Sequence, residues 1–101
     1  MTTEETFNIT DAIQYSEAQK VVVEKNCIAI IATQLGDTIA QINGITLFPS
    51  LTPNLTAGDS ITIADPQGRI YKGKCQIQFA SPAGVNPLIE LVQVFVPSIE
   101  L

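Results

Sequence analysis

The residue types that most often carry out enzyme chemistry are scarce in this sequence. Histidine is absent from the 101 residues, so the chain has no imidazole base and no histidine metal ligand. Two distant cysteines, Cys27 and Cys75, cannot form a structural zinc site. No glycine-rich loop precedes an expected helix, so no phosphate-binding loop is indicated. We therefore expect no catalytic residue, no metal ion and no cofactor.

Asp59 and Asp65 are the two carboxylates whose spacing raises the question of a cation site. They flank one short expected strand, and a calcium ion shared between them is one interpretation. Calcium prefers about six to eight oxygen ligands, and no further regularly spaced oxygen ligands accompany this pair. The preferred interpretation is that each aspartate hydrogen-bonds the backbone of its own turn.

The two cysteines lie in apolar, β-rich runs, where a free thiol behaves as a small apolar side chain. The N-terminal sequence MTTEETFNIT is acidic and polar, unlike a secretory signal, so we expect folding in a cytoplasm. Two buried, reduced thiols are therefore expected, with a disulfide as the alternative.

Composition and charge restrict the class of partner. Hydrophobic residues make up 46% of the chain and charged residues 15%, which is enough apolar material for a core of ordinary size. The net charge of −5 opposes binding to phosphate backbones, so no nucleic-acid partner is expected. No apolar run approaches the length of a membrane span, and we expect no membrane partner.

The length predicts a single β domain over residues 1–101, with a loose arm at 1–6 and a short tail at 97–101. Abundant β-branched residues favour strands. Asn43-Gly44 stands between two apolar runs, and this dipeptide is the strongest short-range signal of a β-hairpin. Turn signals recur about every dozen residues. The fold class expected is all-β, an antiparallel β-sandwich or jelly-roll-like small barrel of seven to eight strands.

Two further hairpins are predicted from local sequence. Residues 61–79 contain turn chemistry at Asp65-Pro66-Gln67-Gly68, which suggests one complete hairpin. Residues 20–24 and 27–33 are two β-rich runs with a short break, and are interpreted as another. Ser16 and Gln19 have the spacing of a capping box, so a short helical turn within residues 10–20 is the alternative to extended chain there.

Side-chain alternation predicts which faces are buried. Period two places Tyr71, Gly73, Cys75, Ile77 and Phe79 on a core face, and Lys72, Lys74, Gln76 and Gln78 on a wet face. The runs CIAIIAT and LIELVQVFV are instead apolar on both sides, although one face of each sheet in a sandwich normally meets water. Either the N-terminal segment or another subunit must cover them. We favour a subunit, because the N-terminal segment can hide only one such strand.

The order of these pieces resembles a known family. The segment VVVEKNCIAIIATQLGDTIAQINGITL is followed by LTAGDSITI, a glycine turn, YKGKCQIQF and a final LIELVQVFV. Over about residues 20 to 96, this order is similar to small β-sandwich accessory proteins of tailed-phage virions, the auxiliary capsid or head-decoration proteins, including those of crAss-like phages. The resemblance implies a non-enzymatic oligomer on the capsid exterior, and it supplies no catalytic residues.

The expected function is therefore that of a virion structural protein that binds and stabilises capsid or connector subunits, made in the host cytoplasm. A carbohydrate- or protein-binding β-sandwich module outside a capsid is the alternative. Capsid or other virion proteins, and further copies of this chain, are the expected partners. The residues expected at the interface are Val94, Phe95, Ile99 and Leu101.

Overall fold

The computed structural model describes residues 8–9, 12–23, 26–53, 55–82 and 84–95. The expected arm at 1–6 and tail at 97–101, with Ile99 and Leu101, lie outside these residues. Within the described part the chain forms nine short strands and no helix. The strands are β1 (Asn8–Ile9), β2 (Ile13–Tyr15), β3 (Gln19–Val21), β4 (Cys27–Gln34), β5 (Ala40–Ile42), β6 (Ile45–Leu47), β7 (Ser60–Ala64), β8 (Cys75–Phe79) and β9 (Ile89–Phe95).

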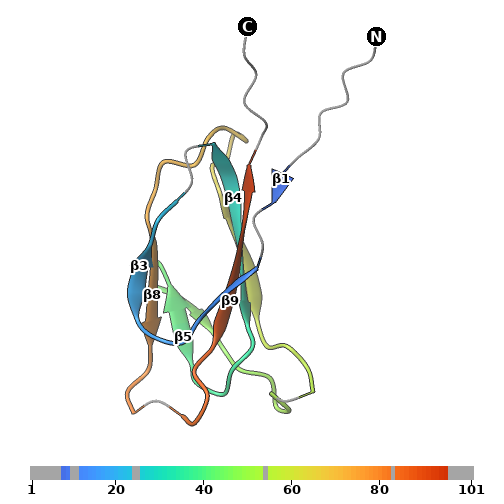
Figure 1. Cartoon of the computed structure of the whole chain (residues 1–101), viewed down its shortest axis with the longest axis vertical. Coiled ribbons are helices and arrows are strands. Elements are labelled where there is room, and N and C mark those ends of the chain that lie inside the picture. The colour runs from blue at the N-terminus through green and yellow to red at the C-terminus, as the bar shows by residue number, and fades with distance from the viewer. Residues whose placement is uncertain (1–7, 10–11, 24–25, 54, 83, 96–101) are drawn as a thin grey trace, which may run out of the picture.

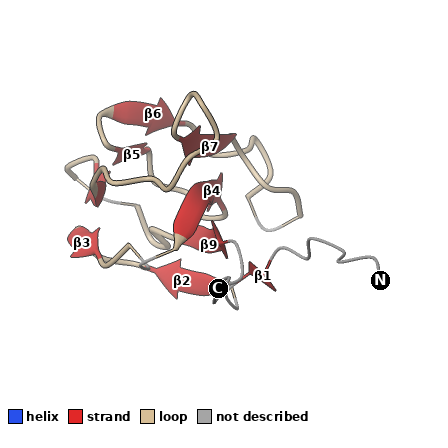
Figure 2. Ribbon diagram, turned by 90° about the horizontal axis from the view of Figure 1, so that it is seen from above, coloured by secondary structure: helices blue, strands red, loops and turns tan. Residues whose placement is uncertain are grey.

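The strands form two antiparallel sheets that face each other (Figures 1 and 2). One sheet has the order β1-β9-β4-β7, with β2 also paired to β9, and the other has the order β3-β8-β5-β6. Because β1 and β2 pair with different parts of the same edge of β9, they act as one edge strand and each sheet is four strands wide. This confirms the expected antiparallel β-sandwich.

The pairing is nested about the middle of the chain. Residues 8–9 pair with 94–95, 13–15 with 89–91, 19–21 with 75–77, 29–33 with 60–64, and 40–42 with 45–47. The chain is thus one long hairpin, and it is wrapped so that β4 also pairs with β9 and β5 with β8. With β1 and β2 counted as one strand, this is the order of a jelly roll.

Asn43 and Gly44 form the turn at the apex of this long hairpin. Both have positive φ, 51° and 84°, as a tight two-residue turn between β5 and β6 requires. The Asn43 side chain also fixes the turn to β8, because its Oδ1 accepts the Gln76 N–H at 2.9 Å and its amide donates to the Lys74 carbonyl at 2.6 Å. The predicted turn is confirmed.

The two other predicted hairpins are wrong. β7 pairs with β4 in one sheet, whereas β8 pairs with β5 and β3 in the other. The turn at residues 65–68 does form, with the Gly68 N–H donating to the Asp65 carbonyl at 2.9 Å, but it begins a crossover between sheets. Likewise β3 and β4 lie in different sheets. Turn chemistry fixes the local chain direction, while burial of apolar faces decides the pairing partner.

The alternative of a helical turn within residues 10–20 is also wrong for the described part. β2 and β3 occupy residues 13–15 and 19–21, and they pair with β9 and β8. A helix of one or two turns would leave most of its backbone groups without intrahelical partners. In β2 and β3, pairing with β9 and β8 supplies hydrogen-bond partners for these backbone groups instead.

The core lies between the two sheets. Its buried apolar side chains are Val21, Cys27, Ile30, Ala32, Ala40, Ile42, Leu47, Cys75, Ile77, Ile89 and Leu91. In β8 the predicted alternation holds, since Cys75 and Ile77 are buried and Gln78 is exposed. In β4 and β9 the inward side chains are buried, but the outward ones are also largely apolar.

We predict that Gly44→Val destabilises the fold by about 1–2 kcal/mol or more, because it places a β-branched residue at positive φ. A Cβ at Gly44 would meet no atom within 4 Å, so the loss would come from the backbone alone. Gly44→Asn is the matched control, since asparagine tolerates this conformation. Thermal unfolding of both variants makes the comparison. Equal melting temperatures for wild type and Gly44→Val would show that the turn does not set the register.

Candidate functional site

The outward face of the β1/β2-β9-β4-β7 sheet carries an apolar strip on its two central strands. The strip consists of Ala29, Ile31, Val92 and Val94, and all four side chains are partly exposed. Ile31 lies directly opposite Val92 across the β4–β9 pair, and Ala29 directly opposite Val94. We call these four residues the outer strip. Their inward-facing neighbours Ile30 and Leu91 are buried in the core.

The expected interface residues are only partly brought together. Val94 belongs to the outer strip, whereas Phe95 alternates with it and lies on the face toward the other sheet. Both are partly exposed. Val94 and Phe95 therefore cannot contribute to one flat contact, and Val94 is the residue that the outer face presents.

A second candidate surface is the end of the sandwich where three connections meet, shown at the bottom of Figure 1. These are the described parts of residues 35–39, 48–59 and 80–88, without 54 and 83, and we call them the loop end. Gln34 lies under it and is fully buried. Its side-chain amide donates to the carbonyls of Thr38 at 2.8 Å and Leu47 at 3.1 Å, while its Oε1 accepts the Gly36 N–H at 3.0 Å. A buried amide with these partners holds the connections in fixed positions.

Asp37 ties two of these connections together. Its carboxylate accepts the backbone N–H groups of Val85 at 3.0 Å and Asn86 at 2.9 Å, and the Thr38 hydroxyl at 2.9 Å. The hydrogen bond from Asn86 is the largest cause of the lowered pKa of Asp37, because it stabilises the charged form. Gly36 packs so closely that an added Cβ would overlap the Asn86 carbonyl.

Aliphatic side chains project from the loop end. Leu51 is fully exposed, Leu55 is 84% exposed and Val85 is 98% exposed. Phe48, at the base of the 48–59 connection, is also exposed, and its N–H donates to the Asp59 carboxylate at 2.8 Å. Loops held on a rigid scaffold, with apolar tips in water, are typical of a binding surface.

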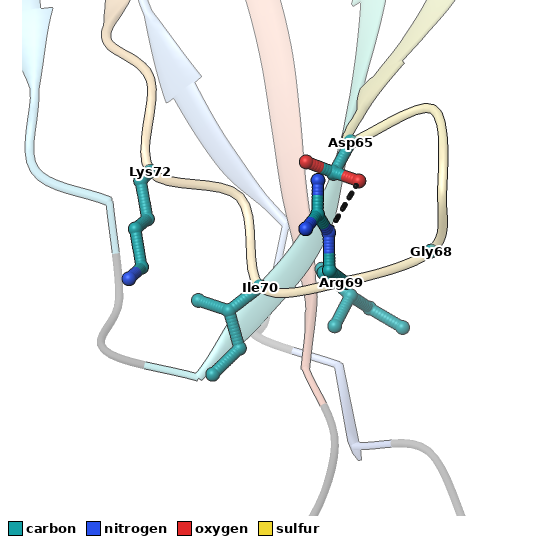
Figure 3. Close-up of a pocket in the computed structure, with 6 residues that line it drawn as sticks. Asp65, Gly68, Arg69, Ile70 and Lys72 are labelled. Carbon is teal, nitrogen blue, oxygen red and sulfur yellow. Dashed lines mark hydrogen bonds and ion pairs between the residues drawn. The ribbon is translucent and has the colours of Figure 1, made fainter.

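The opposite end of the sandwich contains a pocket of about 630 Å³ (Figure 3). It is lined by Ile28, Asp65, Gly68, Arg69, Ile70 and Lys72. Asp65 shapes the turn by accepting the Gln67 N–H at 2.8 Å, and it pairs with the Arg69 guanidinium at 3.4 Å. The pocket therefore has aliphatic walls and a cationic side, which we call the basic pocket.

The carboxylates considered for calcium do not meet. Asp59 and Asp65 lie at opposite ends of β7, with the five residues of this extended strand between them, so one ion cannot touch both. Among the residues that the structure describes, no group of three or more histidine, cysteine, aspartate or glutamate side chains is placed to hold a metal. No helix in the described ranges is long and apolar enough to cross a membrane.

The cysteines are free and fully buried, as expected, on strands of different sheets. The Cys27 thiol donates to the Ala29 carbonyl at 3.2 Å. Burial raises the pKa of Cys75 to about 11, with a smaller contribution from Cys27. The Cys75 thiol is therefore not activated as a nucleophile, because its raised pKa keeps it protonated at neutral pH.

Sequence patterns marked β4 and β9 as apolar on both faces and named Val94 of the outer strip, but they missed the loop end and the basic pocket. Leu51, Leu55 and Val85 are isolated aliphatic residues in polar loops, and they show no periodicity. The pocket forms because the 65–74 crossover passes Ile28, a contact that local sequence does not encode. The signal available was the unusual presence of leucine and valine in the tips of proline-containing loops.

A scan of the chain against protein-family models and searches of curated proteins and of solved structures gave no match.

We predict that the protein loses stability as the pH rises from about 9 through about 11, in part because of Cys75. The folded state raises the pKa of this thiol above its ordinary value of 9.0, so the stabilisation is complete below 9 and disappears as the folded thiol ionises. Urea unfolding at pH 7 to 11 measures this, and Cys75→Ala should flatten the alkaline part of the curve. Parallel curves for the two proteins would contradict the assignment.

Proposed function

We propose that the protein is a non-enzymatic structural protein of a phage virion, and that it binds and stabilises a capsid or connector subunit through the outer strip. The observation that carries the proposal is the apolar face at Ala29, Ile31, Val92 and Val94 on the central strands of a sandwich. Jelly rolls are a common architecture of viral capsid domains, which supports the class of protein but identifies no partner by itself.

The outer strip suits a protein contact for physical reasons. β4 and β9 are central and paired on both sides, so their backbone positions are fixed before any partner arrives. Burying the four apolar side chains against a complementary surface would favour association at about 25 cal/mol per Å² of apolar area. The net charge of −5 keeps the free protein soluble until it docks.

The setting proposed is the exterior of a virion, after synthesis in the host cytoplasm. A surface that faced packaged DNA would gain from positive charge, whereas this chain carries ten acidic and five basic residues. The family resemblance of the sequence supports the same setting. Capsid or other virion proteins, and further copies of the chain, are the proposed partners, without a nucleic acid or a membrane.

A second candidate is a carbohydrate-binding module, and one feature favours it. The outward face of the other sheet carries Gln41 directly opposite Gln78, and two shallow hollows of about 420 and 290 Å³ share Gln78. Amide side chains both donate and accept hydrogen bonds, as sugar hydroxyls require. Aromatic rings that stack on sugars are few in a chain with six aromatic residues in a hundred. This candidate therefore ranks second.

We predict that Val94→Lys abolishes binding to capsids assembled from the major capsid protein of the same genome, while strand content is unchanged. A lysine buried in an apolar contact leaves an unpaired charge there, at a cost of several kcal/mol. Co-sedimentation with the capsids measures binding, and circular dichroism measures strand content. A chain truncated after Pro97 tests the contribution expected from Ile99 and Leu101.

Gln78→Lys is the matched control, because it makes the same charge change on an exposed side chain of the other sheet. It should bind as wild type does. Unchanged binding by folded Val94→Lys would overturn the role of the outer strip. Loss of binding in Gln78→Lys alone would move the contact to the amide face, and a wild type without capsid affinity would rule out the virion assignment.

A further inference from the structure

We propose that copies of this chain associate head to tail, with the apolar tips of the loop end of one copy entering the basic pocket of the next. This contact goes beyond the proposed function and does not depend on the outer strip. The two surfaces lie at opposite ends of the same strands (Figure 1). The loop end of one molecule therefore cannot reach the basic pocket of that same molecule.

The basic pocket has the features of a site for an acidic, aliphatic segment. Ile28 and Ile70 provide its apolar wall. Arg69 and Lys72, both labelled in Figure 3, supply positive charge. Lys72 is exposed and makes no hydrogen bond or ion pair with another described residue, whereas Arg69 is paired with Asp65. A volume of about 630 Å³ lies in the range of ligand pockets, and is large enough for the side chains of one loop tip. A small anion fits the pocket less well than an aliphatic segment, because it would leave Ile28 and Ile70 in contact with water.

The loop end supplies an aliphatic segment with one carboxylate, that of Asp59, at its base. The 48–59 connection presents Leu51 and Leu55 almost entirely to solvent. At its base the Asp59 carboxylate accepts the Phe48 N–H, the Asp59 N–H donates to the Phe48 carbonyl at 3.0 Å, and the Gly58 N–H donates to the Gln34 carbonyl at 2.8 Å. The base of the connection is therefore already ordered, so little conformational entropy would be lost there on docking.

The charges of the loop end and of the 65–74 crossover are complementary. The three connections of the loop end contain two aspartates, Asp37 and Asp59, and no lysine or arginine. The 65–74 crossover contains Asp65 and three basic residues. Complementary charge orients two copies as they meet and disfavours contact between like ends. In an acidic chain, this separation of charge favours the head-to-tail arrangement over a symmetric one.

A contact between two different surfaces is heterologous, and repeating it gives a ring if the rotation closes or an open string if it does not. Either product fits the proposal, because each copy uses both ends. The contact leaves the outer strip free, since that strip lies on the flat face of β4 and β9 between the two ends.

The test uses one variant for each end of the full-length chain. Lys72→Glu reverses a charge in the pocket, and Leu51→Asp with Leu55→Asp makes the loop tip polar and more acidic. All three side chains are exposed, so the fold is retained. Lys20→Glu is the charge-matched control outside the pocket. Sedimentation velocity at increasing protein concentration measures the assemblies, at low and at high salt.

The expected result is growth of wild type and Lys20→Glu beyond a dimer, weaker at high salt, and at least about tenfold weaker association for each end variant. A mixture of the pocket variant and the loop variant should form a one-to-one dimer and nothing larger, because one good interface remains. Monomeric wild type, unaffected end variants, or a mixture that stays monomeric would overturn the proposal. Loss of capsid binding in Val94→Lys with assembly intact would show that the two contacts are separate.

Discussion

The nested pairing of the chain about Asn43-Gly44 is the constraint on which the rest of the structure depends. The innermost pair closes over two residues, and each further pair is added around one already formed. Loop closure costs little more when an inner pair has already brought the chain together. The Asn43 side chain stabilises the turn at the apex, because it hydrogen-bonds to the backbone beside and within β8, the strand that pairs with β5.

This pairing also determines where binding surfaces can form. A long hairpin wrapped into two sheets sends nearly every connection from one sheet to the other, so the connections gather at the two ends. At one end Gln34 and Asp37 bind the connections through backbone hydrogen bonds and leave apolar tips exposed. At the other end the 65–74 crossover encloses a pocket against Ile28. The central strands β4 and β9 present the outer strip between these ends.

Much of this could be predicted from the sequence, but the pairing could not. The apolar runs marked most strands, and Asn43-Gly44 marked the apex because positive φ restricts residue type. The turn at Asp65 was also correct as a turn, yet β7 and β8 entered different sheets, since turn residues do not specify a partner strand. For the candidate site, the sequence did show that β4 and β9 are apolar on both faces, because apolar and polar residues do not alternate along them. The loop end and the pocket depend on long-range contacts, which no local pattern records.

The composition of virions produced from the genome that encodes this chain tests the proposed structural role most directly. Quantitative mass spectrometry of purified particles should find the protein in a fixed ratio to the major capsid protein. The ratio should hold after particles are separated from the lysate on a density gradient, because the apolar contact proposed for the outer strip, unlike an exposed ion pair, is not weakened by the high salt of the gradient. Particles that lack the protein, when lysates of infected cells contain it, would contradict a structural role in the virion.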